Sequence, residues 1–177
     1  MRVKRSQLIV IRRAPGNARQ ARVQLAHAVV AAAVGRGGIL GLKREGDGGT
    51  PRGRFPLRMA LYRADRMQRP RTVLPLRAIR DGDGWSDDPR DANYNRLITL
   101  PCARSAEGLK RKDHVYDLIA VLGYNDGPRV KGRGSAIFMH LARAGYSPTE
   151  GCIALSQRDL TRLLAQMRPG TRVVVLG

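Results

Sequence analysis

The residues with the clearest potential for chemistry are a histidine and a cysteine in the last third of this 177-residue chain. His140 ends an apolar run, and Cys152 follows Gly151 at the start of another. A cysteine at the mouth of a strand, preceded by a flexible glycine, can present its sulfur beside backbone N–H groups. A thiol nucleophile with an oxyanion hole needs this setting. A nearby imidazole could accept the thiol proton and lower the pKa of Cys152 below its reference value of about 8.5. Taken alone, the pattern fits either a nucleophile or an inert, buried cysteine.

The other cysteine and histidines stand in less informative surroundings. Cys102 follows an apolar run and is expected to be a packing residue, as most cysteines are. His27, among small and aliphatic residues, predicts a core or edge position, whereas His114 predicts a solvated loop. No ligand spacing typical of a zinc site connects these residues, so we expect no metal site, and a thiol–imidazole mechanism would need no organic cofactor.

Short apolar runs bounded by turn residues predict the strands that must position His140 and Cys152. The predicted strands are 8–11, 22–25, 54–61, 96–100, 115–122, 135–140, 152–155 and 172–176, and 28–34 fits either a further strand or a helical turn. The polar segment 81–95 predicts a long loop.

One helix is predicted near the C-terminus, at about 156–168. Ser156 can cap its first turn, with Asp159 three residues later. Apolar residues at helical spacing follow, and Pro169-Gly170 ends the pattern. The sequence therefore predicts one mainly-β domain over residues 1–177, with a single helix near its end.

Composition and charge exclude several classes of protein. No run of 18 apolar residues is present, which excludes a transmembrane helix, and two cysteines cannot staple a disulfide scaffold. The chain has 33 basic and 14 acidic residues, a net charge of +19 that attracts nucleic acid, anionic lipid or an acidic wall polymer. The basic residues are dispersed and aromatic residues make up only 5%. We therefore expect no specific nucleic-acid partner, and a non-catalytic nucleic-acid-binding protein is a remote alternative.

Two stretches make the chain similar to the YkuD-type L,D-transpeptidases. Residues 46–57 read Gly-Asp-Gly-Gly-Thr-Pro-Arg-Gly-Arg-Phe-Pro-Leu and resemble the family's Gly-x-x-x-Thr-Pro-x-Gly-x-Phe stretch. Further along, His140 and Thr149-Glu150-Gly151-Cys152-Ile153 resemble the second signature, a histidine followed by Ser/Thr-x-Gly-Cys and an apolar residue. Asp159 also matches a position that is commonly acidic in that family. The resemblance extends from about residue 8 to residue 176.

The resemblance implies a small β-sandwich that cross-links peptidoglycan through a cysteine acyl-enzyme. Cys152 would attack an L-residue carbonyl whose amide leads to a D-residue, with His140 as general base and then acid. The backbone at Thr149 would orient His140, and N–H groups around Gly151 would hold the oxyanion. A diaminopimelate side-chain amine of a second stem peptide would resolve the thioester. With water as acceptor, the enzyme would instead be an L,D-carboxypeptidase or endopeptidase.

The chain departs from the family pattern in three ways. Glu150 stands where the family usually has histidine, Ala154 stands where it usually has arginine, and the segment from His140 to Cys152 is shorter. An unpaired carboxylate near the thiol would raise the pKa of Cys152. The missing arginine leaves a substrate carboxylate without its usual partner, a charge that Arg133 or Arg143 could supply. The expected substrate-binding set is Tyr146, Ser147, Glu150, Arg133 and Arg143.

These departures bear on which bond of the stem peptide is cut. A donor site without the usual anchors favours the L-Ala to D-Glu bond, giving 1,3 rather than 3,3 cross-links, and the compact chain resembles the short proteobacterial branch of the family. The substrate implies the periplasm or cell envelope, although the basic start and the short apolar run at 8–11 do not form a secretory signal.

Overall fold

Strands dominate the computed structural model, which describes residues 7–25 and 28–177, so the prediction for His27 lies outside the described residues. The main sheet contains β1 (Leu8–Ala14), β2 (Asn17–Leu25), β3 (Ala28–Ala33), β6 (Gly53–Tyr62), β7 (Leu76–Ala78), β11 (Leu118–Leu122), β12 (Phe138–Leu141), β13 (Ile153–Leu155) and β14 (Arg172–Leu176). Segment 28–34, which fitted two interpretations, is thus largely strand. The mainly-β prediction is confirmed.

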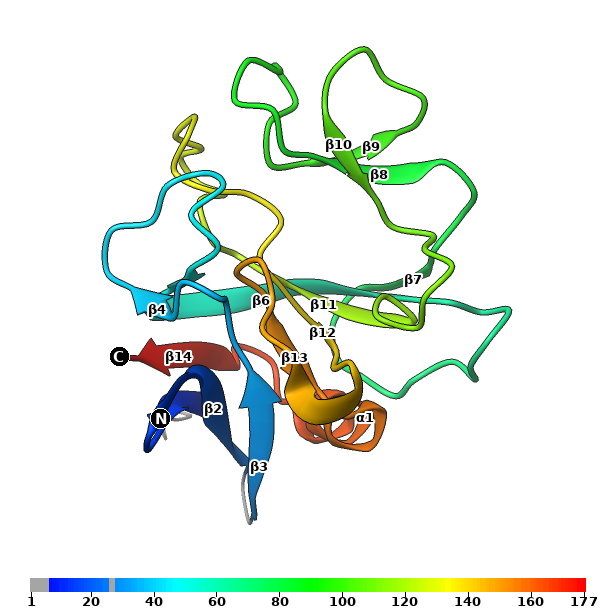
Figure 1. Cartoon of the computed structure of the whole chain (residues 1–177). Helices are drawn as coiled ribbons and strands as arrows, with labels where there is room; N and C mark the ends of the chain where they lie inside the picture. The colour runs from blue at the N-terminus through cyan, green and yellow to red at the C-terminus, as the bar shows by residue number, and fades with distance from the viewer. Residues whose placement is uncertain (1–6, 26–27) are drawn as a thin grey trace, which may run out of the picture.

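The main sheet curls until the strand at one end pairs with the strand next to the other end. Its strand order is β11-β12-β13-β3-β2-β1-β14-β6-β7, and β11 also pairs with β6. This extra pairing makes the two halves of the sheet face each other across one apolar core, in the sandwich-like arrangement expected (Figure 1). Alternate residues along each strand supply that core, because successive side chains point to opposite faces.

The helix α1 (Gln157–Gln166) confirms the predicted helix. Ser156 caps it, because its side-chain oxygen accepts a hydrogen bond from the Asp159 backbone N–H. The buried leucines Leu160, Leu163 and Leu164 pack into the main core. Among the described residues, no helix is long and apolar enough to cross a membrane.

The prediction of a long loop over 81–95 is wrong in part. This segment contains β8 (Asp83–Ser86), which pairs with β9 (Leu97–Thr99) and β10 (Ala106–Gly108) in a small separate sheet. Asp83 and Gly84 interrupt the apolar alternation by which strands are recognised, although Trp85 is buried. In the remaining pair, β4 (Ile39–Leu40) lies beside β5 (Thr50–Pro51), which is part of the first signature stretch.

A second apolar cluster lies between the main sheet and this small sheet. Leu118, Ala120 and Leu122 of β11 face the main core, whereas Ile119 and Val121 face the second cluster. Both faces of β11 are therefore buried, which explains its unbroken apolar sequence. The second cluster also contains Cys152, so the cysteine lies in the layer that β8–β10 cover.

Candidate functional site

Strand register brings His140 and Cys152 to the same side of the sheet. β12 and β13 are parallel neighbours, with Met139 opposite Ile153 and His140 opposite Ala154. Met139 and Ile153 belong to the main core. Because side chains alternate, His140 and Cys152, the residue just before β13, both point to the face opposite the main core.

Both side chains line one cavity of about 480 Å³. The cavity lies beside the second apolar cluster and has a strongly charged wall. Its charged lining residues are Glu45, Asp87, Glu107, Arg111, Arg143 and Glu150. The volume is in the usual range for a ligand site, and the charged lining suits a polar substrate better than a purely apolar ligand.

The Cys152 thiol is protonated in this environment. Only 7% of the residue is exposed, and Sγ lies 3.2 Å from the Ala136 carbonyl oxygen and 3.4 Å from the Phe138 backbone nitrogen. Burial, followed by the nearby Glu107 carboxylate, raises the pKa of Cys152 to about 12. The expectation of a lowered thiol pKa is therefore wrong, because loss of solvation outweighs the single N–H donor from Phe138.

His140 is held as a neutral base. Its Nδ1 lies 2.9 Å from the Leu141 carbonyl oxygen. Because a carbonyl only accepts, Nδ1 carries the proton and Nε2 keeps its lone pair. Burial, and then the positive charges of Arg143 and Arg111, lower the pKa of His140 to about 4. The Tyr116 ring packs edge-on against the imidazole, with ring centroids 5.3 Å apart.

These two pKa shifts predict how the reactivity of the free thiol changes with pH. In a Cys102→Ala variant, alkylation of Cys152 by iodoacetamide should be slow near neutral pH and should keep rising toward the thiol pKa of about 12. A Cys152→Ala variant reports the contribution of Cys102 alone. A plateau already reached at neutral pH would indicate a thiolate–imidazolium pair and would contradict this prediction.

Thr149 and Gly151 shape the turn that precedes the nucleophile. Thr149 Oγ1 donates to the Cys152 carbonyl oxygen (2.6 Å) and accepts from the Gly151 N–H (3.2 Å). Gly151 has a φ of +130°, and a Cβ there would lie 2.8 Å from the Gly49 carbonyl oxygen. Only glycine fits this backbone approach.

The hydrogen bonds of Thr149 and Gly151 differ from those that their expected roles require. The Thr149 carbonyl accepts the Arg36 backbone N–H (2.8 Å), and the carbonyl that orients His140 is that of Leu141. The expectation for Thr149 is therefore corrected. The Gly151 N–H donates to Thr149, so it would have to exchange this acceptor to hold an oxyanion.

Thr50 explains why the two signature stretches occur together. Its fully buried hydroxyl accepts from the Gly35 N–H and donates to the Gly151 carbonyl oxygen, each at 2.9 Å. The first signature thereby fixes the backbone immediately before Cys152, about a hundred residues away. Sequence reasoning matched this threonine to a family pattern without finding its contact.

Thr50→Val should destabilise the protein and impair the site. It leaves the Gly35 N–H and the Gly151 carbonyl without this partner. The expected loss is about 2–4 kcal/mol, since each unsatisfied buried group costs about 1–3 kcal/mol. Urea unfolding measures it. Thr50→Ser keeps the hydroxyl and should retain most of the stability; an equal loss in both variants would contradict the hydrogen-bond explanation.

The predicted substrate-binding residues divide into two groups. Arg143 and Glu150 line the cavity. Tyr146 and Ser147 lie at the short helical turn that begins at Ala144, and Arg133 lies in the loop before β12. In the described part of the chain, these three are not among the residues that line the cavity.

Glu150 does not act on the thiol as the sequence suggested. Both of its carboxylate oxygens accept from Arg36 Nε, at 2.9 and 2.8 Å, and both side chains are exposed. Water screens such a pair. The carboxylate that contributes to the raised pKa of Cys152 is Glu107.

Sequence reasoning missed several residues of the cavity wall, and three of them contact one another. Tyr116 donates from its hydroxyl to Glu107 Oε1 (2.7 Å), and the Arg111 guanidinium lies 5.1 Å from the Tyr116 ring centroid. Burial raises the pKa of Glu107. Glu107 belongs to β10, a strand without an apolar pattern, and Tyr116 precedes the actual start of β11 within a segment predicted as strand.

The remaining cysteine and histidine predictions have mixed outcomes. Cys102 is exposed, so its expected packing role is wrong. His114 is exposed, as predicted, and its ring contacts Asp117. Among the described residues, no group of three His, Cys, Asp or Glu side chains could hold a metal ion.

Comparison with protein families shows what the chain is similar to. The family model of the L,D-transpeptidase catalytic domain, YkuD, matches residues 6–175. No curated protein and no solved structure matches the chain. The matched range includes both signature stretches, the cavity and almost all of the described fold. The chain therefore belongs to the YkuD family of L,D-transpeptidase catalytic domains.

Proposed function

We propose that the protein is a peptidoglycan L,D-transpeptidase that forms a thioester on Cys152 and transfers the acyl group to an amine. The observation that carries this proposal is the meeting of Cys152 and His140 in one charged cavity, from neighbouring parallel strands. Family membership supplies the reaction class, and this pair supplies a nucleophile and a base.

The reaction begins from two neutral groups. As Sγ attacks the L-residue carbonyl carbon, the thiol proton passes to Nε2 of His140, so a free thiolate is not required. The imidazolium then gives this proton to the departing amine of the D-residue, and a thioester remains. The acceptor amine attacks the thioester, its proton passes to His140, and Cys152 leaves and regains the proton. The hydrogen bond to the Leu141 carbonyl keeps Nδ1 protonated throughout, so Nε2 is the nitrogen that accepts and returns protons.

Two arginines support recognition of a substrate carboxylate. Arg111 Nη2 lies 2.7 Å and Arg143 Nη2 lies 3.3 Å from the same Asp113 oxygen, at the cavity wall. Either guanidinium could exchange Asp113 for a carboxylate of the stem peptide. With Ala154 in place of the usual arginine, this arrangement favours the L-Ala to D-Glu bond as donor, and hence 1,3 cross-links. With peptidoglycan as the proposed substrate, the proposed location is the periplasm or cell envelope.

Incubation of the enzyme with purified sacculi, followed by mass spectrometry of the muropeptides, tests this function. We expect new dimers whose fragmentation shows a 1,3 link between L-Ala and diaminopimelate. Dimers with a 3,3 link would overturn the donor assignment alone. Shortened stems without new dimers would identify a hydrolase, and unchanged muropeptides would contradict the proposal.

A further inference from the structure

The distribution of charge along the chain is sharply uneven. All 14 acidic residues lie between Glu45 and Asp159, so residues 1–44 and 160–177 contain none. The acid-free segments form β1, β2, β3 and β14, which are neighbours in the sheet. In Figure 1, β2, β3 and β14 lie on the opposite side of the view from β8, β9 and β10. The basic residues of these four strands therefore have no acidic residue on the same strands.

Four arginines lie on the outer face of this part of the sheet. Arg12 is directly opposite Arg22 on β2, Arg54 is opposite Val174 on β14, and Arg172 is opposite Leu8 on β1. Their strand neighbours Ile11, Val23 and Val173 are buried in the core, and Phe55 packs against it. Alternation therefore directs all four guanidinium groups outward, and all four residues are exposed.

Among the described residues, these four guanidinium groups differ from the eight arginines that form ion pairs. Within the described residues, none of the four forms an ion pair, whereas Arg58, Arg63, Arg66, Arg90 and Arg111 each do. Like charges directly opposite each other in a sheet destabilise it. The pairing of Arg12 with Arg22 therefore costs stability that a bound anionic surface would restore.

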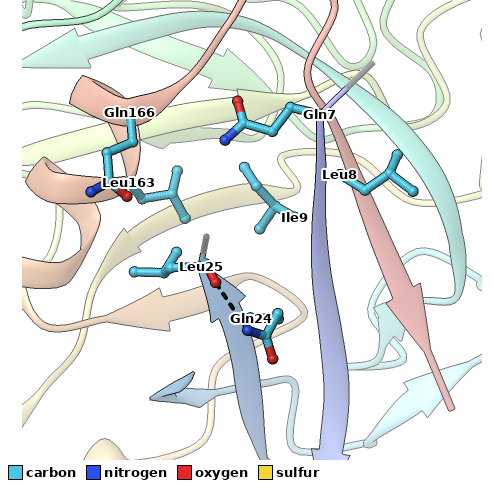
Figure 2. A pocket seen from close by; sticks show the side chains of 7 residues that line it. All are labelled: Gln7, Leu8, Ile9, Gln24, Leu25, Leu163 and Gln166. Carbon is cyan, nitrogen blue, oxygen red and sulfur yellow. Dashed lines mark hydrogen bonds between the residues drawn. The ribbon is translucent and has the colours of Figure 1, made fainter. Parts of the chain in front are cut away.

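Aliphatic side chains share this outer face with the arginines. Leu8 is 45% exposed and Val29 is 57% exposed. Figure 2 shows Leu8 and Ile9 on opposite sides of β1, with Ile9 directed toward Leu25 and Leu163. Val29 is opposite Gln24 on the outward side of β3, whereas Val30 packs against the core. No aromatic residue is among the outward-facing positions of these strands.

We propose that the outer face of β3-β2-β1-β14-β6, marked by Arg12, Arg22, Arg54, Arg172, Leu8 and Val29, binds the anionic phospholipid surface of a membrane. Arginine binds phosphate oxygens in a bidentate manner, and exposed aliphatic side chains gain free energy by entering the headgroup region. Nucleic acid fits less well, because single strands would need an aromatic platform for bases and the phosphates of a duplex offer nothing to the exposed Leu8 and Val29. This inference does not depend on the proposed chemistry.

Vesicle binding at low salt tests the proposal with the full chain. We expect binding to an equal mixture of phosphatidylcholine and phosphatidylglycerol, little binding to phosphatidylcholine alone, and loss of binding as salt is added. Arg12→Gln with Arg22→Gln should weaken binding about thirty-fold, at about 1 kcal/mol for each basic residue. The matched control replaces the exposed Arg104 and Lys131, far along the chain, with Gln and should weaken binding less than about three-fold.

Three further measurements keep the result decisive. The Arg12/Arg22 variant should be at least as heat-stable as the natural chain, since a like-charge contact is removed. It should also cleave a soluble stem peptide at the natural rate. Leu8→Ser with Val29→Ser should weaken vesicle binding and leave binding to duplex DNA unchanged. Equal losses in both arginine pairs, equal affinity for the two vesicle types, or tighter binding of duplex DNA than of anionic vesicles would each overturn the proposal.

Discussion

Replacing Cys152 with alanine is expected to abolish both cross-linking and stem-peptide cleavage, by more than about 10⁴-fold. The reason is that every covalent step of the proposed reaction passes through Sγ, and among the described residues no other thiol lines the cavity. The fold should persist, because alanine keeps an apolar side chain in the second cluster and loses the Sγ hydrogen bonds with Ala136 and Phe138. Muropeptide analysis measures activity, and circular dichroism checks the fold.

The natural control for this variant is the second cysteine. Cys102 is exposed and lies outside the lining of the cavity that contains Cys152. Cys102→Ala should therefore leave the rate unchanged within a factor of about two, as is usual for a surface substitution. Retained dimer formation by the Cys152→Ala protein would show that the reaction proceeds without this nucleophile.

Replacing His140 with glutamine is expected to lower the rate by about 10²–10⁴-fold, the usual contribution of a general base. Glutamine can still donate to the Leu141 carbonyl, so the loss isolates the proton acceptor at Nε2. Because burial lowers the pKa of His140 to about 4, the natural enzyme should keep its base unprotonated from neutral pH down to that value. Its rate should fall only as the pH approaches 4, whereas the residual rate of the variant should lack this step.

His114→Gln provides the comparison for His140. The His114 side chain is 81% exposed and contacts Asp117 at the surface. This variant should retain nearly the full rate at neutral pH. A similar loss in both variants, or a full rate in His140→Gln, would remove His140 from the proposed mechanism.

The sequence predicts the parts of the fold whose patterns are local. Ser156 and the spaced leucines predict α1 because capping and one-sided burial depend on neighbouring residues. The apolar runs at β6, β11 and β14 likewise predict buried strands. The placement of His140 and Cys152 on one face of the sheet follows from two short strands, once these are recognised as parallel neighbours.

Other features depend on contacts between distant segments. β8 and β10 pair with each other despite weak apolar patterns, and they deliver Glu107 to the cavity. The Thr50 hydroxyl acts on a glycine far along the chain. The thiol pKa was predicted in the wrong direction because the degree of burial outweighs the presence of a nearby imidazole, and burial is a property of the assembled layers.

The most direct test of the account is to trap the covalent intermediate. The enzyme is mixed with a donor stem peptide in the absence of acceptor, quenched in acid, and analysed by intact-mass and peptide mass spectrometry. The account predicts a mass increase equal to the acyl fragment, located on the peptide that contains Cys152 and removed by hydroxylamine. Accumulation of product without any adduct on that peptide, or an adduct on another residue, would contradict it.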